Sequence, residues 1–214
     1  MLGLWENLSK VFYDYKKEGI WQLGEEAAAA ANGQEPGDIK VQDVDGNGVI
    51  TTDDRIIYSQ RPDVTFGFNN TFNYKGFDLS VFLYARLGQW IAYDYNTTYR
   101  INALENGGNV DYWTPENPTN AFPRPNKSKS YTQVTYYSTL KYEDGSFFKI
   151  RDITLGYTFK PELLKHLNLS RLRVYATAKN FFTFSHLDNY DPERGGSLSY
   201  PMTKQAVFGI NVDF

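Results

Sequence analysis

Apolar and polar side chains alternate along the last stretch of the chain, up to its final residue. The apolar positions of this stretch are Ala206, Phe208, Ile210, Val212 and Phe214. The side chains between them belong to Val207, Gly209, Asn211 and Asp213. Successive side chains of a β-strand point to opposite faces, so this period of two predicts a strand with one apolar face. Soluble domains more often end in a polar tail, whereas an apolar strand at the terminus is typical of transmembrane β-barrels.

The same alternation predicts four more strands upstream. Together with the terminal strand, they cover about residues 64–74, 77–92, 147–159, 171–184 and 204–214. The first two form a hairpin, because Gly76 accepts the positive φ of a tight turn. In the third strand, Lys149 and Arg151 fall among the apolar positions. Two explanations stay open: this end of the strand lies above a membrane, or a β-bulge shifts its phase.

The connections between the predicted strands alternate between short and long. The short ones are residues 75–76 and 160–170, and the long ones are 93–146 and 185–203. Outer-membrane barrels combine short periplasmic turns with longer extracellular loops. The sequence therefore predicts an all-β fold, an antiparallel up-and-down transmembrane β-barrel segment of about five carboxyl-terminal strands with long extracellular loops. In this orientation Phe214 lies at the periplasmic rim.

A second fold class fits the same alternation. In a secreted β-sandwich, the apolar face of each strand packs against a second sheet instead of lipid. Such a protein would be a carbohydrate-binding module braced by calcium. The loop asymmetry and the terminal aromatic residue favour the barrel. The two fold classes differ in what covers the apolar face, which is lipid in the barrel and a second sheet in the sandwich.

Composition narrows the function classes. The net charge of −3 gives no electrostatic basis for binding nucleic acid. With two histidines and no cysteine, we find no nucleophile–base constellation, and the chain is predicted not to be an enzyme. No run approaches the roughly 18 apolar residues of a membrane helix. Aromatic residues make up 17% of the chain, which fits a β-rich fold and the aromatic girdles of a barrel.

Residues 1–63 are predicted to hold a partial strand, a short helix and an extracellular loop. The strand covers Val11–Tyr15, and the helix covers Glu25–Ala31 because alanine has the highest helix propensity. The segment Asp43–Asp54 matches a twelve-residue, EF-hand-like calcium loop, with Gly48 at the sixth position, where the chain must turn sharply.

Calcium prefers six to eight hard oxygen ligands, which such a loop brings together. The predicted metal ligands are Asp43, Asp45, Asn47, Val49 through its carbonyl, Thr51 and Asp54. The last position carries aspartate where an EF-hand normally has glutamate, so we expect weak, structural Ca²⁺ binding rather than a sensor. The alternative is an Asp- and Gly-rich turn without metal.

Several motifs together resemble the carboxyl-terminal part of SusC/RagA-type TonB-dependent outer-membrane transporters. They are residues 15–22, residues 36–40 running into the 43–54 loop and Arg55, residues 72–80, residues 171–176 with Lys179-Asn180, and the closing strand to Phe214. The resemblance covers nearly all of the chain from about residue 11, and the motifs occur in the family's order.

This resemblance implies a barrel of about 22 strands with a plug domain, in the outer membrane of a Gram-negative cell. Such a multi-pass barrel imports glycans or peptides with energy from TonB, beneath a SusD-type surface lipoprotein. The chain would supply the last five strands of the barrel, in contact with membrane lipid. The plug and the TonB-contacting part are absent, so we expect a fragment.

Two further groups of residues are candidates for function. Flat aromatic rings stack on sugars, and the candidate ligand contacts are Trp90, Tyr93, Tyr95, Tyr99, Tyr112 and Trp113. For these rings, loop packing and the membrane girdle are the favoured alternative. The resemblance also implies that the barrel assembly machinery recognises the terminal strand, through Phe208, Ile210, Val212 and Phe214.

Overall fold

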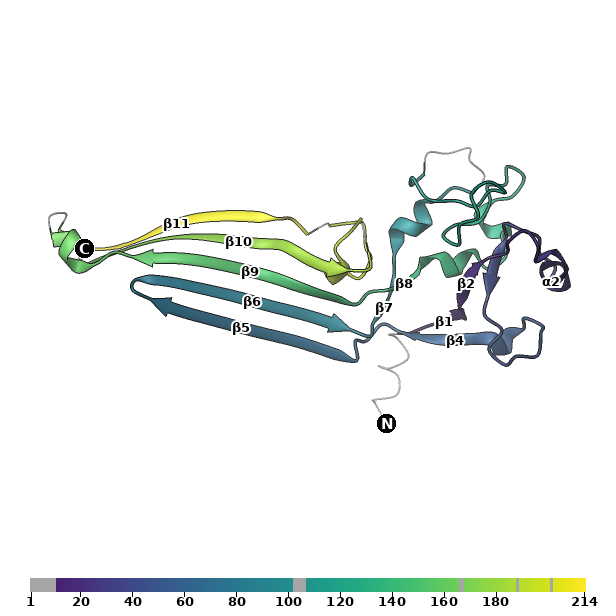
Figure 1. Cartoon of the computed structure of the whole chain (residues 1–214), viewed down its shortest axis with the longest axis horizontal. Coiled ribbons are helices and arrows are strands. Elements are labelled where there is room, and N and C mark those ends of the chain that lie inside the picture. The colour runs from purple at the N-terminus through teal and green to yellow at the C-terminus, as the bar shows by residue number, and fades with distance from the viewer. Residues whose placement is uncertain (1–10, 102–106, 166–167, 188, 201) are drawn as a thin grey trace. The chain divides into compact units, whose positions relative to one another are not determined.

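The computed structural model describes residues 11–101, 107–165, 168–187, 189–200 and 202–214. These residues form two compact units (Figure 1). Unit 1 combines the described residues up to Arg61 with Gln89–Asp144 and Gly195–Leu198. Unit 2 combines Pro62–Gly88 with Gly145–Arg194 and Ser199–Phe214. The long segment predicted to lie between two strands therefore belongs largely to unit 1.

Unit 2 is built on one antiparallel sheet of five strands in the order β11-β10-β9-β6-β5. The strands are β5 (Val64–Tyr74), β6 (Phe77–Leu87), β9 (Phe147–Thr158), β10 (Arg171–Ser185) and β11 (Gln205–Asp213). Two short helices, α3 (Pro161–Leu164) and η6 (Pro192–Arg194), also belong to this unit. Sequential strands are spatial neighbours, so the predicted all-β, up-and-down antiparallel segment is confirmed. A closed barrel is not formed by these five strands.

The β5–β6 hairpin pairs without interruption from Val64–Leu87 to Tyr74–Phe77. Lys75 and Gly76 form its turn with φ of 48° and 90°. Strand β6 ends at Leu87, earlier than the predicted end at residue 92, because Gly88 takes a φ of 79° and leaves the ladder. Residues 90–92 instead form strand β7 of unit 1.

A β-bulge in strand β9 resolves the phase of Lys149 and Arg151. Asp152 pairs with Phe82 of β6, but the next pair joins Ile150 to Leu83, so Arg151 is the extra residue. The ladder to β10 shifts at the same level, between Lys179 and Phe182. Because one extra residue reverses which side chains face each side, Lys149 shares the polar face of the sheet.

The apolar face of the sheet has no protein cover. Its side chains are exposed on every strand, for example Phe72, Leu155 and Ile210, and the exposed fraction reaches 81% at Phe208 and 94% at Phe214. Within the described part of unit 2 the five-stranded sheet is the only sheet. A β-sandwich requires a second sheet on this face, so the sandwich alternative is wrong.

The polar face carries a close-packed cluster across four strands. Arg173 of β10 donates two hydrogen bonds to Asp78 of β6, at 2.9 Å from Nε and 2.5 Å from Nη2. The intervening strand β9 offers Gly156 there, and a Cβ at that position would collide with both partners. On the other side, Gly209 of β11 leaves room for the ring of Tyr175, which lies 4.9 Å from the Arg173 guanidinium.

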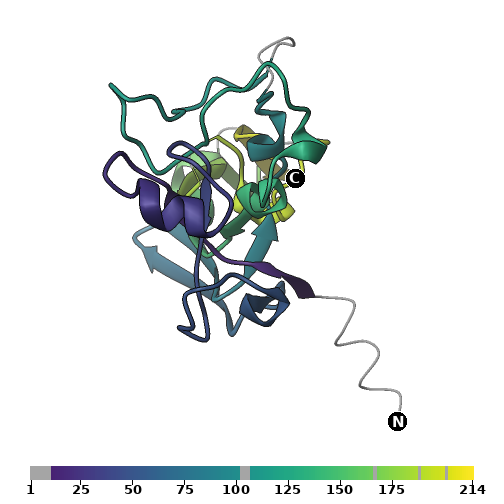
Figure 2. The ribbon, with the colours of Figure 1, turned by 90° about the vertical axis from the view of Figure 1, so that its right-hand side faces the viewer.

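Unit 1 is held together by short strand pairs and a small apolar core. Strands β1 (Val11–Tyr15) and β4 (Arg55–Ser59), β2 (Lys17–Ile20) and β3 (Ile39–Val41), and β7 (Trp90–Ala92) and β8 (Tyr142–Asp144) pair antiparallel. Helix α2 covers Glu26–Ala31, and 3₁₀ turns cover Thr52–Asp54, Asp94–Thr98, Tyr131–Gln133 and Tyr137–Lys141. The core contains Ile20, Ile39, Val41, Trp113 and Leu140. Figure 2 shows helix α2 in dark purple and the winding segment after residue 107 in green.

Among the described residues, no helix combines the length and the apolar character needed to cross a membrane. The longest helix in the described ranges, α2, has six residues.

The packing at Gly209 predicts a site-specific stability defect. Gly209→Ala places a methyl group inside the Tyr175 ring, so we expect a loss of about 1–3 kcal/mol of unfolding free energy. The measurement is unfolding of the complete receptor by urea in detergent. The folded fraction is read from the difference in electrophoretic mobility between folded and heat-unfolded receptor. Gly67→Ala is the matched control, because a Cβ there meets the Phe82 ring at an ordinary 3.7 Å. An equal loss in both variants would contradict the packing argument.

Candidate functional site

The Asp43–Asp54 loop is shaped by hydrogen bonds from its backbone to its carboxylates. Asp43 accepts the N–H groups of Gly46 and Gly48, both at 2.7 Å. Gly48 has a φ of 85°, as the sharp turn at the sixth position requires. Ile50, the apolar residue at the eighth position of the loop, packs against the core of unit 1. The loop therefore curls around its own acidic side chains.

Asp54 closes the loop from its far end. Its side chain is fully buried and accepts the N–H of Val44 at 2.8 Å and that of Thr51 at 2.7 Å. The backbone N–H of Thr51, followed by those of Val44 and Asp45, lowers the pKa of the Asp54 carboxyl below its usual value. The ionised carboxylate is thus the form that this loop stabilises.

Three carboxylates converge inside the loop. Ligand oxygens of Asp43, Asp45 and Asp54 all lie within 4.8 Å of one another. Asn47 stands beside them, since its amide Nδ2 donates to Asp45 at 2.7 Å and its Oδ1 accepts the N–H of Val49 at 2.8 Å. Hard, anionic oxygens at this spacing are the ligands that Ca²⁺ prefers. The donor set fits the ion that the loop pattern predicted.

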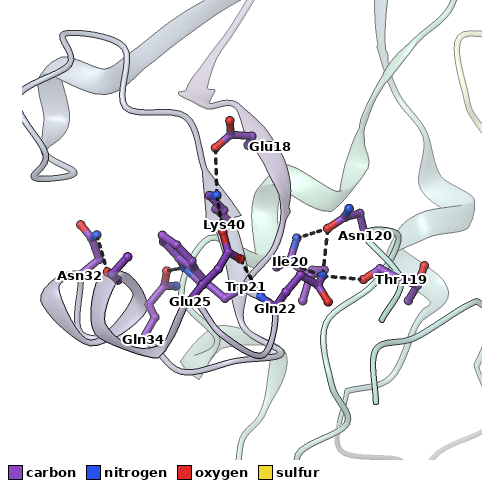
Figure 3. Close-up of polar contacts among 11 residues, drawn as sticks. Glu18, Ile20, Trp21, Gln22, Glu25, Asn32, Gln34, Lys40, Thr119 and Asn120 are labelled. Carbon is purple, nitrogen blue, oxygen red and sulfur yellow. Dashed lines mark hydrogen bonds and ion pairs between the residues drawn. The ribbon is translucent and has the colours of Figure 1, made fainter. Parts of the chain in front are cut away.

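The loop is tied to a polar junction around Trp21. Asn32, which ends helix α2, accepts the N–H of Ile50 at 3.3 Å. Trp21 donates from Nε1 to Gln34 at 2.7 Å, and the Lys40 ammonium lies 4.7 Å from the Trp21 ring centre. Figure 3 shows Lys40 between two carboxylates, and its Nζ is 3.0 Å from Glu25 and 3.9 Å from Glu18.

The same junction fastens a segment about 100 positions further along the chain. The side-chain oxygen of Asn120 accepts a hydrogen bond from the backbone N–H of Ile20 at 3.0 Å. It accepts a second one from the side-chain amide of Gln22 at 3.1 Å (Figure 3). Gln22 in turn accepts from Nε1 of Trp113 at 2.8 Å. These contacts hold a stretch that has no periodic pattern, and no local pattern in the sequence predicts the contact between Gln22 and Asn120.

The six candidate aromatic contacts do not gather at one surface. Tyr93, Tyr99 and Trp113 are buried, while Trp90 and Tyr95 are half-buried. Tyr99 donates its hydroxyl to the Pro123 carbonyl at 2.9 Å. Tyr112 is the one exposed ring of the six, at 43%. Packing within unit 1 accounts for most of these rings.

The four side chains proposed for assembly lie on one face of an edge strand. Phe208, Ile210 and Val212 alternate along β11, and Phe214 follows directly after it. All four are exposed. In the described part of the chain, β11 is paired on one side alone, with β10.

Sequence comparison finds relatives of this chain among outer-membrane receptors. No family model matches. TonB-dependent receptors P3 and P26 of Formosa agariphila are each 31% identical over 95% of this chain, which corresponds to 22% of each receptor. TonB-dependent receptor SusC of Bacteroides thetaiotaomicron is 30% identical over 80% of this chain and 17% of its own length.

Solved structures give the same result for the fold. The RagAB peptide transporter matches 95% of this chain and 23% of its own chain, with a TM-score of 0.68 and 24% identity. The RagAB peptide importer in its open-open state gives a TM-score of 0.65 at 26% identity, and it too matches 95% of this chain.

A sheet with one uncovered apolar face and one polar face defines the wall of an outer-membrane β-barrel. The curated relatives of this chain are TonB-dependent receptors, SusC among them, and such receptors are outer-membrane proteins and not enzymes. This chain spans about a fifth of the length of the curated relatives it matches. The resemblance is confirmed, and the chain corresponds to a part of such a receptor, as the carboxyl-terminal assignment predicted.

The Trp21 junction predicts a pH-dependent opening of the helix α2 segment. The pKa of Glu25 is lowered, first by the Gln22 N–H and then by Lys40. A lowered pKa in the folded state stabilises the fold above the unfolded value of about 4.3, and this contribution is lost as the pH falls through the folded value. Amide hydrogen exchange of residues 21–37 should therefore speed up below about pH 4.3 relative to exchange in Glu25→Gln. An identical pH profile in that variant would contradict the assignment.

Proposed function

We propose that this chain forms part of the wall and extracellular surface of a TonB-dependent nutrient importer. The observation that carries the proposal is the match over 95% of the chain to TonB-dependent receptors, joined to a sheet whose apolar face is uncovered. In this role the apolar face contacts lipid, and the polar face lines the lumen. Energy would come from TonB through an amino-terminal part of the receptor.

The transported nutrient is an oligosaccharide or a peptide. The RagAB structures are those of a peptide transporter, and their likeness to this chain supports a peptide. The resemblance to SusC-type receptors supports a glycan as well. Deleting the receptor that contains this chain should abolish growth on one nutrient class, and inactivating TonB should cause the same loss. Unchanged growth on every glycan and peptide tested would contradict the importer role.

The receptor is expected to act with a SusD-type surface lipoprotein. Resemblance to the SusC/RagA type supports this partner, and RagAB is a close structural neighbour of the chain. Copurification of the complete receptor with the product of an adjacent lipoprotein gene tests this part of the proposal.

The Asp43–Asp54 loop is proposed to bind Ca²⁺ as a structural clamp. Asp43, Asp45 and Asp54 would supply carboxylate oxygens, and Asn47 its amide oxygen. Val49 would supply its carbonyl, and Thr51 would hold a water molecule. The clustered carboxylates and the positive φ of Gly48 support this assignment.

Calcium binding is tested by calorimetry on the complete receptor. Asp45→Asn removes one anionic ligand, so we expect Ca²⁺ affinity to fall about tenfold or more, because affinity follows the charge of the ligand set. Asp53→Asn is the control, since Asp53 has the same side chain but lies outside the ligand set. If neither the wild type nor the control binds Ca²⁺, the loop is a metal-free turn.

The terminal strand is proposed to be the assembly signal of the barrel. The four exposed apolar side chains of Phe208, Ile210, Val212 and Phe214 on one face support a surface that the assembly machinery contacts.

Removing Phe214 from the complete receptor should lower the amount inserted in the outer membrane severalfold, because the apolar face loses its terminal ring. Phe214→Tyr keeps the ring and is the control. The measurement is the fraction of receptor in purified outer membranes with folded mobility. Normal insertion after the deletion would remove this role.

A further inference from the structure

A groove of about 600 Å³ runs along strand β10 on the apolar face of the sheet. Figure 1 shows β10 between β9 and β11, and all three strands belong to unit 2. The side chains that line the groove include Val174 and Ala176 of β10, Leu155 and Tyr157 of β9, and Phe208 and Ile210 of β11. Strand β10 therefore forms the floor of the groove, and its two neighbours form the walls.

The groove follows from the small side chains of β10. Ala176 is directly opposite Leu155 on one side and Phe208 on the other, and residues opposite each other share a face of the sheet. Leu155 is 52% exposed and Phe208 is 81% exposed, so both stand above the alanine methyl group. The next position on this face of β10, Ala178, is equally small. From Val174 to Ala178 the floor is about 13 Å long, since a strand rises about 3.3 Å per residue.

The dimensions of the groove fit one acyl chain. One leaflet contributes about 15 Å to a hydrocarbon core of about 30 Å, so the floor lies within a single leaflet. The walls stand on strands about 10 Å apart, because neighbouring strands are separated by about 4.8 Å. A membrane helix with its side chains is about 10–12 Å wide and does not enter between the wall side chains. A chain of methylene groups is narrow enough to enter.

One end of the groove carries a tyrosine at the expected level of lipid headgroups. The Tyr157 ring contacts the rings of Phe77 and Phe159, at centroid distances of 4.7 and 5.0 Å. In the part of the chain that the structure describes, no hydrogen bond involves its hydroxyl. Outward-facing tyrosines of membrane proteins gather at the boundary between hydrocarbon and headgroups. The Tyr157 hydroxyl is therefore available to donate to a phosphate oxygen.

A lysine lies in the turn beside Tyr157. The β5–β6 turn adjoins the end of β9, because the carbonyl of Gly76 accepts the N–H of Thr158 at 2.7 Å. Lys75 of this turn is exposed, and its ammonium is 5.2 Å from the ring centre of Tyr74. This ammonium is thus placed at the same end of the apolar face as the Tyr157 hydroxyl.

The side-chain charges at this end of the sheet have a positive sum. Among the described residues, the connection between β9 and β10 carries exposed Lys160 and Lys165 and one exposed carboxylate, Glu162. Arg171 is opposite Asp213 in the ladder, so this pair adds no net charge. With Lys75 of the neighbouring turn, three ammonium groups stand against one carboxylate. Such an excess attracts an anionic headgroup.

We propose that the groove binds one anionic phospholipid of the periplasmic leaflet. An acyl chain lies over Ala176, and the headgroup phosphate lies near Tyr157 and Lys75. This inference rests on the proposed function, which places the apolar face in lipid and the short connections of the sheet in the periplasm. The remaining apolar face contacts lipid at no fixed position, whereas the groove holds a single molecule by both its chain and its headgroup.

Native mass spectrometry of the complete receptor in detergent tests the site, with phosphatidylglycerol as the titrated probe. Ala176→Phe fills the floor, so we expect the affinity to fall about tenfold or more, because an acyl chain that loses two buried methylene groups already loses that much. Val81→Phe is the matched control, since Val81 is opposite Ile153 on the same face of the sheet and lies outside the groove lining.

The headgroup contacts have their own variants. Tyr157→Phe keeps the ring, so phosphatidylglycerol should bind about tenfold more weakly, the loss expected for one hydrogen bond to a charged group. Tyr74→Phe is the matched control, because Tyr74 is an exposed tyrosine outside the groove lining. Lys75→Gln should reduce the preference of the receptor for phosphatidylglycerol over zwitterionic phosphatidylcholine. If Ala176→Phe does not fold, Tyr157→Phe and Lys75→Gln still decide the proposal.

The outcomes separate this inference from the importer role. Equal phosphatidylglycerol affinity in the wild type and the groove variants overturns the site, and so does equal affinity of the wild type for phosphatidylcholine. Tighter binding of lipid A that Ala176→Phe abolishes overturns the assignment to a phospholipid. Normal nutrient uptake by cells without the expected lipid binding overturns the site alone. The expected lipid binding in a receptor that takes up no glycan or peptide overturns the importer function alone.

Discussion

The fold of unit 2 depends on where its sheet can place one apolar face. Five strands present aromatic and aliphatic side chains to the same side, and the described residues of the unit form no second sheet that covers them. In water this surface would far exceed the few hundred Å² that soluble monomers normally expose. Lipid satisfies the face without any protein contact. The polar face, with its interlocked Asp78, Arg173 and Tyr175, then becomes the side that meets water and other parts of the receptor.

The apolar face of the sheet is continuous only if the alternation of apolar and polar side chains keeps the same phase on every strand. The bulge at Arg151 is therefore essential, because without it Lys149 would face lipid and Phe148 the lumen. The bulge instead brings Lys149 to the polar face, where Asp191 and Glu193 neutralise it. One extra backbone residue thus decides both the membrane compatibility of β9 and the anchoring of the loop after β10.

Local patterns predicted most of unit 2 and little of unit 1. The alternation of apolar and polar residues located all five strands, because the residues of a strand themselves determine which side chains lie on each face. The predicted end of β6 was too late, because the alternation does not show that Gly88 leaves the strand with a positive φ. The carboxylates of residues 43–54 converge as their spacing predicted, because the loop is local. Contacts such as Gln22 to Trp113 and Lys149 to Asp191 join positions far apart in the chain, and single-residue patterns carry no trace of them. The burial of Tyr93, Tyr99 and Trp113 was not predicted for the same reason, since it depends on contacts that local patterns do not show.

The central claim is that the apolar face of the sheet meets lipid and that its phase reverses at Arg151. Nitroxide labels placed one at a time along residues 147–158 of the complete receptor in bilayers test it directly. Relaxation by oxygen, which concentrates in lipid, should peak at residues 153 and 155, and again at 150 and 148, while a water-soluble nickel chelate should favour 149, 152 and 154. An unbroken alternation that leaves residue 149 in lipid, or no alternation at all, would contradict the account.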